Sequence, residues 1–375
     1  MEFLAFILVL ALAYANGTND VSKVIATLVG SGVTNYRAAI LWGTLWTIAG
    51  AGASALIAGA MVNTFSQGLV RPGTAIDPVA ASAVLTGAMA WVLFASRTGF
   101  PVSTTHALTG AIVGTGLATF AGDALIWSAI AKKIALPLSL SPMLALTVSL
   151  LIHPLVRLLA TRWEGACVCV MPASRALVAI DARGGTRTLF QTASFGQPVM
   201  AVPSQCDRAG LRGLVMGLDT IHWVSSGLAS FARGTNDAPK IVAMLLLGSA
   251  TASWSSISSE LAAFGGVALA MGLGSYFGGL RVTTVLAEKV TTMNHAEGLS
   301  ANLSTASLVL AAGTLGLPVS TTHLSSAAII GIGLAKGTEA VRWGTVLDMV
   351  LAWVVTVPAA GLLAGLAFAV LSRVL

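Results

Sequence analysis

The sequence predicts an all-α polytopic membrane protein built from two copies of one transmembrane unit. Of its 375 residues, 56% are hydrophobic and only 9% are charged, whereas soluble globular domains carry roughly 25% charged residues. Apolar stretches of membrane-crossing length recur along the chain. Two polar motifs interrupt these stretches, and each motif occurs twice at one constant spacing, which indicates a duplication.

The apolar stretches predict the membrane helices. A bilayer core about 30 Å thick is crossed by roughly 20 helical residues. The 40 glycines fit helices that pack closely in lipid, because small residues let backbones approach one another. Some stretches are long enough for single helices and others are interrupted, so we expect about ten to twelve membrane-embedded helices, several of them broken or re-entrant. The stretches are Phe3–Ala15, Ala38–Val62, Val79–Ala95, Pro142–Ala160, Leu214–Phe231, Leu261–Leu280 and Val346–Leu371.

The first polar motif is Gly-Thr-Asn-Asp-x-x-Lys, which occurs at Gly17–Lys23 and again at Gly234–Lys240. Its Asn and Asp residues favour helix starts, and glycine disfavours helix interiors. We therefore expect one helix to stop and another to begin near Asn19 and near Asn236. Pro239 fits the first turn of such a new helix, where the amides lack intrahelical partners.

The second motif is Pro-Val-Ser-Thr-Thr-His, at Pro101–His106 and again at Pro318–His323. Proline and a preceding glycine break the chain, and a new helix then begins beside three hydroxyl groups. The free amides and the positive dipole end of such a helix attract anions, and hydroxyls donate to oxyanion oxygens without adding charge. The six hydroxyl residues are Ser103, Thr104, Thr105, Ser320, Thr321 and Thr322.

Both motif pairs share one offset. Asp237 follows Asp20 by 217 residues, and His323 follows His106 by the same 217 residues. A duplicated unit is the economical explanation. Matching interruptions in the two halves of a membrane chain point to a carrier site formed by broken helices near the bilayer midplane.

A polar segment divides the chain into three predicted parts. These are a first transmembrane repeat over residues 1–160, a cytoplasmic insert over 161–212 and a second transmembrane repeat over 213–375. Between Arg157 and Arg212 there are seven arginines and three acidic residues, and positively charged loops stay on the cytoplasmic side. Short apolar runs separated by Pro and Gly favour a small hairpin within the insert.

All three cysteines, Cys167, Cys169 and Cys206, lie in the insert. A metal site would need a fourth ligand and a different spacing. We therefore expect reduced thiols and no metal site.

The ionisable residues of the first motif are the main candidates for function. Asp20 and Lys23 are three residues apart, as are Asp237 and Lys240, so each pair lies on one helical face. One isolated pair is equally well explained as a neutralising salt bridge. Two pairs at matched positions within membrane segments favour a site. Since the pairs cancel, the empty site is predicted to be neutral, and a bound dianion needs protons or cations to offset it.

His106 and His323 follow the hydroxyl triplets. Histidine titrates near neutral pH, so a proton-shuttling role stays open. A structural role, with the ring bonded to neighbouring backbone, is the interpretation we favour.

At these two motif pairs the sequence resembles the inorganic phosphate transporter (PiT) family, also called the phosphate permease family. The resemblance rests on the two duplicated motifs, on the central hydrophilic loop and on the segment Gly279–Thr283 ahead of the second hydroxyl motif. It covers both halves and leaves out the loop from about residue 163 to 212. It implies secondary active uptake of phosphate, coupled to sodium or protons, by two inverted-topology repeats that alternate access around a central site.

The resemblance also implies a set of binding residues. The Asn-Asp pairs match signature positions linked with substrate and cation binding, and the hydroxyl triplets match residues that hold the anion and the coupling ions. With the two motif lysines, the predicted substrate site consists of Asn19, Asp20, Lys23, Ser103, Thr104, Thr105, Asn236, Asp237, Lys240, Ser320, Thr321 and Thr322.

The chain departs from the family pattern at two kinds of position. The usual signature continues to an Asn where this chain has Lys23 and Lys240, and sodium-coupled members carry glutamates where this chain has Thr47 and Asn302. We hypothesise that the ammonium groups do part of the work of coupling cations, which favours protons over sodium. The candidate coupling-ion residues are Asp20, Asp237, Thr47, Asn302, His106 and His323.

These observations predict a proton- or sodium-coupled phosphate symporter in the inner cell membrane, with a sulfate permease of the same family as the alternative. Arsenate is a further tetrahedral substrate candidate. A channel needs a continuous polar path, and an enzyme needs a nucleophile with a base or a metal site; the sequence shows neither. We expect no catalytic residues, no cofactor and no nucleic-acid partner. The expected partners are the oxyanion and the lipid bilayer, and a homodimer stays open.

Overall fold

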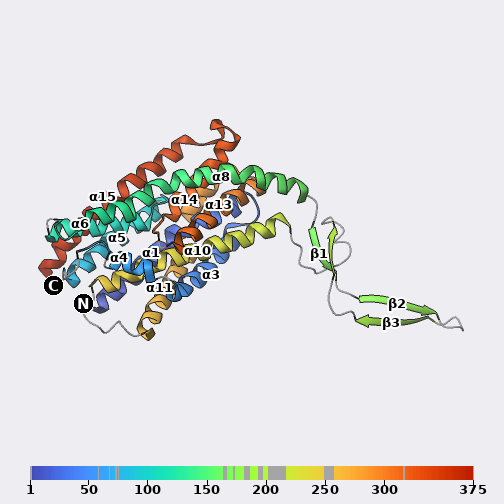
Figure 1. Cartoon of the computed structure of the whole chain (residues 1–375), viewed down its shortest axis with the longest axis horizontal. Helices are drawn as coiled ribbons and strands as arrows, with labels where there is room; N and C mark the ends of the chain where they lie inside the picture. Colours follow the sequence, from blue (N-terminus) through green and yellow to red (C-terminus); the bar gives the residue numbers. More distant parts are fainter. Residues whose placement is uncertain are drawn as a thin grey trace.

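The structure is a computed structural model that describes most of the chain as a body of long helices, together with strands from the insert (Figure 1). The described residues are 2–57, 59–66, 68–71, 74, 76–120, 122–163, 167–171, 174–180, 186–192, 197–201, 217–248, 257–315 and 317–374.

The helices occur in the same order in both halves of the chain. The first half contains α1 (Glu2–Asp20), α2 (Ser22–Gly30), α3 (Tyr36–Ala53), η1 (Ser54–Leu56), α4 (Gly59–Ser66), α5 (Pro78–Thr98), α6 (Thr104–Phe120), α7 (Trp127–Ala129), η2 (Ile130–Ala135) and α8 (Leu136–Trp163). The second half contains α10 (Leu218–Gly248), α11 (Ile257–Gly278), α12 (Leu280–Glu288), α13 (His295–Thr314), α14 (Thr321–Lys336), η4 (Thr338–Ala340) and α15 (Trp343–Val374). The 217-residue offset takes the first residue of α5 to that of α13, and the first residue of α6 to that of α14.

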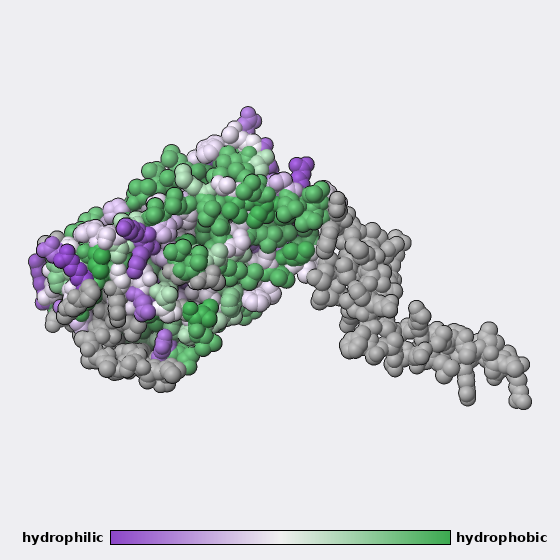
Figure 2. Space-filling model, viewed as in Figure 1, coloured by the Kyte–Doolittle hydropathy of each residue, from purple (hydrophilic) through white to green (hydrophobic). Residues whose placement is uncertain are grey.

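Long apolar helices dominate the described structure. Leucine side chains on α8 and α15 are exposed, with 70% exposure at both Leu151 and Leu362. Hydrophobic residues spread over the side of the helical body, and the hydrophilic ones gather toward its ends (Figure 2), which is the pattern of a protein solvated by lipid. Six helices within the described ranges are long and apolar enough to cross a membrane, and they span Phe3–Gly30, Tyr36–Leu56, Pro78–Thr98, Trp127–Thr161, Glu260–Gly278 and Trp343–Val374.

Of the two breaks predicted at the first motif, the one near Asn19 is present as a short interruption and the one near Asn236 is absent. Only one residue, Val21, separates α1 from α2. The predicted helix start near Asn236 is wrong, because α10 runs without interruption through Asn236 and Pro239. The reason is that Asn19 and Asn236 direct their side chains to backbone groups far away in the sequence instead of capping nearby amides. A proline inside a membrane helix is tolerated where neighbouring groups can satisfy the freed backbone.

The breaks predicted at the second motif are confirmed. Helix α5 ends at Thr98, and Gly99 follows with a φ of +86°, a left-handed conformation that glycine adopts without strain. The chain is irregular until α6 begins at Thr104. In the second half α14 begins at the matching residue, Thr321. Two helix N-termini therefore start at the Ser-Thr-Thr triplets.

The insert contains the hairpin that its apolar runs predict. Strand β2 (Ser174–Ile180) pairs antiparallel with β3 (Thr186–Thr192), and β1 (Cys167–Met171) pairs antiparallel with β4 (Gln197–Ala201). The all-α prediction therefore holds for the helical body and not for the insert. Cys206 lies outside the described residues.

The two halves are interleaved in space. Helix α1 packs against α11 of the second half, and α10 packs against α3 of the first half. At Gly274 a Cβ atom would lie 2.0 Å from the carbonyl oxygen of Tyr14, and at Gly234 it would lie 2.6 Å from that of Thr47. These contacts bring each signature helix against the backbone of the other half, as small residues allow in membranes.

Substitution of Gly274 by Ala is expected to destabilise the fold by about 1–3 kcal/mol, because the added methyl group collides with rigid backbone. Gly265→Ala is the matched control on the same helix, since its Cβ would meet no atom within 4 Å. Thermal unfolding of both purified variants checks this, and equal melting temperatures would contradict the packing argument.

Candidate functional site

Asn19 ties helix α1 to the irregular segment before α6. Its Oδ1 accepts a hydrogen bond from the Val102 amide at 3.1 Å, and its Nδ2 donates to the Phe100 carbonyl at 3.0 Å and to Ser96 Oγ at 3.2 Å. In the second half, Asn236 Nδ2 donates to the Val319 carbonyl at 3.3 Å. Both asparagines therefore hold the residue that precedes their own Ser-Thr-Thr triplet.

Each half contains a buried acid–ammonium pair attached to the same place. The Lys23 ammonium pairs with Asp20 and donates to the Val102 carbonyl at 2.8 Å. The Lys240 ammonium lies 3.1 Å from Asp237 Oδ1 and donates to the carbonyl of Val319 at 3.2 Å. The 217-residue offset relates each of these three positions, so the duplicated sequence forms a duplicated set of contacts.

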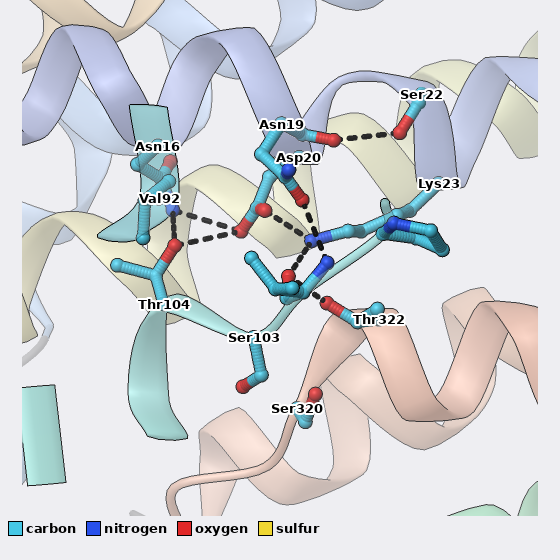
Figure 3. Close-up of polar contacts among 12 residues, drawn as sticks. Asn16, Asn19, Asp20, Ser22, Lys23, Val92, Ser103, Thr104, Ser320 and Thr322 are labelled. Carbon is cyan, nitrogen blue, oxygen red and sulfur yellow. Dashed lines mark hydrogen bonds and ion pairs between the residues drawn. The ribbon is translucent and has the colours of Figure 1, made fainter. Parts of the chain in front are cut away.

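Contacts between the halves join the two sets into one site. Asn16 Nδ2 lies 2.8 Å from Asp20 Oδ2, 3.0 Å from Thr104 Oγ1 and 3.3 Å from Asp237 Oδ2. It thus lies between the carboxylates of the two halves, and Figure 3 shows it beside Asp20 and Thr104.

Two further bonds cross between the halves. Lys240 donates to Thr105 Oγ1 at 2.9 Å, and Thr322 Oγ1 donates to the Val102 carbonyl at 2.7 Å. The predicted substrate residues therefore converge. All twelve are buried, with exposed fractions no greater than the 4% of Thr104.

The six hydroxyls do not play equivalent parts. Ser103 Oγ accepts from the His106 amide at 3.3 Å, and Ser320 Oγ accepts from the His323 amide at 3.2 Å, so both serines cap the new helices. Figure 3 shows the two serines on facing segments of the two halves. Thr104, Thr105 and Thr322 make the contacts with the site described above, and Thr321 is buried at the start of α14.

The two motif histidines meet each other. The ring centroids of His106 and His323 lie 4.5 Å apart, and the His323 ring also lies 4.2 Å from that of Trp353. His323 Nδ1 lies 3.3 Å from the carbonyl oxygen of Leu138. Because a carbonyl only accepts, Nδ1 carries the hydrogen in this contact. For His323, this bond to the backbone of α8 is consistent with the structural role favoured from the sequence. His106 Nδ1 is buried and has no hydrogen-bond partner among the described residues.

The remaining coupling-ion candidates lie at different places. Thr47 Oγ1, on α3, accepts from Arg233 Nη2 at 2.7 Å. Asn302 Nδ2, on α13, donates to Ser225 Oγ on α10 at 3.3 Å. Both side chains are buried, and their hydrogen bonds lead to these partners rather than to the acid–ammonium pairs.

The sequence interpretation missed Asn16 and Arg233. Each directly precedes a copy of Gly-Thr-Asn-Asp, and the 217-residue offset relates them. Arg233 is 0% exposed, and its charge interacts with the carboxylates of both Asp20 and Asp237. Counted together with the two acid–ammonium pairs, Arg233 brings the formal total to three cations and two carboxylates, a charge of +1 where the pairs alone cancel. The signal was present in the sequence as an arginine inside an apolar segment.

Comparison with known proteins identifies the family of this chain. Residues 16–364 match the family model described as the phosphate transporter family. The chain belongs to this family. It is 30% identical to the probable low-affinity inorganic phosphate transporter of Rhizobium meliloti, covering 95% of this chain and 92% of that protein. It is 27% identical to the protein of the same name from Bacillus subtilis, covering 100% of this chain and 98% of that one.

A solved structure, the sodium-dependent phosphate transporter, superposes with a TM-score of 0.76 at 24% identity and covers 100% of this chain and 99% of that one. At this identity the likeness establishes the fold. The family assignment and the membrane-length helices together show that the chain is a multi-pass integral membrane protein. Its family and relatives are transporters and not enzymes.

Replacing Asn19 with Ala is expected to lower stability by about 1–3 kcal/mol, because the buried Val102 amide loses its acceptor. Asn236→Ala should have a smaller effect, because the Val319 carbonyl keeps its hydrogen bond from Lys240. Asn63→Ala, at an exposed position on α4, is the control. Melting temperatures of purified protein measure the effect. An unchanged value in both site variants would show that the asparagines do not hold the hydroxyl segments.

Proposed function

We propose that this family member is a secondary active transporter that carries inorganic phosphate by alternating access. The observation that carries the proposal is the convergence of both acid–ammonium pairs with both hydroxyl triplets in one buried place. Ammonium groups and hydroxyls are the donors that a tetrahedral oxyanion needs. The names of the relatives associate those proteins with phosphate.

The two repeats are inferred to have inverted topology. In Figure 1, α8 runs toward the insert at one end of the helical body, whereas its counterpart α15 runs away from that end toward the C-terminus. Helix α1 starts at the end where both termini lie, and its counterpart α10 starts at the insert. Opposite directions of matched helices support an inverted pair, and rocking of such repeats gives alternating access.

The burial of the site supports an occluded state in the transport cycle. Each carboxylate is satisfied by its own lysine, and each lysine also donates to a backbone carbonyl. An oxyanion that takes over an ammonium group leaves the neighbouring carboxylate without its counter-charge. A buried unpaired carboxylate is strongly unfavourable, so a proton or a cation must bind with the anion. Because the anion and the carboxylate compete for the same ammonium group, binding of the anion is coupled to binding of the proton or cation.

We infer that protons rather than sodium ions fill this role. Two lysines already provide fixed positive charge beside the carboxylates. Thr47 and Asn302, which offer neutral oxygens where glutamates occur in sodium-coupled members, supply no negative charge to attract a metal cation.

Asp20→Asn and Asp237→Asn are expected to reduce phosphate uptake into proteoliposomes to the level of protein-free vesicles, because each change removes the counter-charge of a buried lysine and the group that binds the coupling ion. Asp123→Asn, at an exposed position, is the matched control and keeps the wild-type rate. In the wild type, competition of unlabelled sulfate and arsenate with labelled phosphate ranks the three anions by their affinity for the transporter. Wild-type rates in both site variants, with equal insertion into vesicles, would remove these carboxylates from the mechanism.

Uptake in sodium-free buffer is expected to persist and to increase with an inward proton gradient. Initial rates are compared across choline and sodium buffers, with and without the pH gradient. Counterflow of labelled phosphate against unlabelled phosphate inside the vesicles separates a carrier from a channel, since only alternating access gives transient accumulation. Strict sodium dependence without any response to the pH gradient would contradict proton coupling.

A further inference from the structure

Arg233 is a buried cation whose role the acid–ammonium pairs leave open. It lies on α10, directly before the second copy of the signature, and is 0% exposed. Its Nη2 donates to Thr47 Oγ1 at 2.7 Å and to Ser275 Oγ at 3.4 Å. Its Nε and Nη1 groups are buried and have no hydrogen-bond partner among the described residues.

Within the described part of the chain, Arg233 has no carboxylate of its own. The ion pairs of the site join Asp20 to Lys23 and Asp237 to Lys240. The arginine interacts with both carboxylates only through their longer-range electric fields. Its direct contacts are two neutral hydroxyls, which do not cancel its charge.

Such an arrangement is unfavourable for the resting protein. A buried guanidinium with unused donors loses its hydration without full compensation, and charged residues within membrane segments are usually retained for function. A guanidinium also binds the oxygens of phosphate-like anions well, because it is always charged and weakly hydrated. A bound anion would accept hydrogen bonds from the Nε and Nη1 groups and would also neutralise the charge of the guanidinium.

The two halves of the chain carry different residues at the position occupied by Arg233, and the difference changes the formal charge. The equivalent residue in the first half is Asn16, a neutral side chain that bridges the two carboxylates. Replacing it with an arginine in the second half adds one positive charge without changing the surrounding motif. The duplicated site therefore has unequal halves.

We propose that Arg233 binds the transported oxyanion through its free N–H groups and serves as a built-in counter-ion that replaces one co-transported cation. The inference rests on the proposed function, since it assigns a residue to the same site. With the formal charge at +1, a bound oxyanion needs one fewer proton or cation than it would in a neutral site.

The test is binding of inorganic phosphate and of sulfate to the purified full-length chain, measured by calorimetry with and without sodium. Arg233→Gln is expected to weaken binding by about tenfold to a hundredfold, as loss of a charged hydrogen bond does. It should also make the remaining binding depend more steeply on pH or sodium. Arg233→Lys keeps the charge and should restore part of the affinity.

Arg342→Gln is the matched control, because it removes the same charge from an exposed residue that donates to a backbone carbonyl; it should bind as the wild type does. Wild-type affinity in Arg233→Gln would overturn the proposal. If that variant does not fold, Arg233→Lys decides, since wild-type affinity there would overturn the direct contact through the guanidinium N–H groups. A wild-type protein that binds neither anion would instead refute the proposed function.

Discussion

The buried acid–ammonium pair is the interaction on which the rest of the site depends. Charged groups inside a membrane protein are usually paired, and here each lysine also holds the carbonyl that precedes a hydroxyl triplet. One side chain thus links the signature helix to the start of a broken helix. Because the link is made in both halves, the two helix N-termini are held at one place, and the close packing of α1 on α11 and of α10 on α3 brings the halves together.

Under the proposed alternating-access mechanism, this arrangement would link binding to a conformational change. The groups proposed to hold an anion satisfy one another in this structure, so an anion has to displace internal contacts. The contacts that cross between halves, such as Lys240 to Thr105 and Thr322 to Val102, are the ones that movement of one repeat against the other would break. Arg233 differs from these residues because its free donors gain partners without loss of an internal ion pair.

The failures of the sequence predictions have a common cause. The Asn-Gly-Thr-Asn-Asp cluster has the local chemistry of a helix start, yet α10 passes through its copy unbroken. The local propensity to start a helix is overridden here, because the Asn236 side chain donates a hydrogen bond to the carbonyl of Val319, 83 residues away. The apolar segment around Arg233 marks it as unusual in the sequence, but its partners, Thr47 and Ser275, come from distant helices and follow only from the packing.

The sequence by itself determined the membrane class, the duplication, the breaks at Gly99 and before Thr321, and the types of residue that form the site. These follow from composition, from a constant offset and from local backbone chemistry, all of which act over short distances along the chain. Only the tertiary structure decided which hydroxyls cap helices, which ones contact the charged residues, and that Arg233 is buried with unpartnered N–H groups among the described residues. Those properties depend on the direction of each side chain after helices far apart in sequence have packed together.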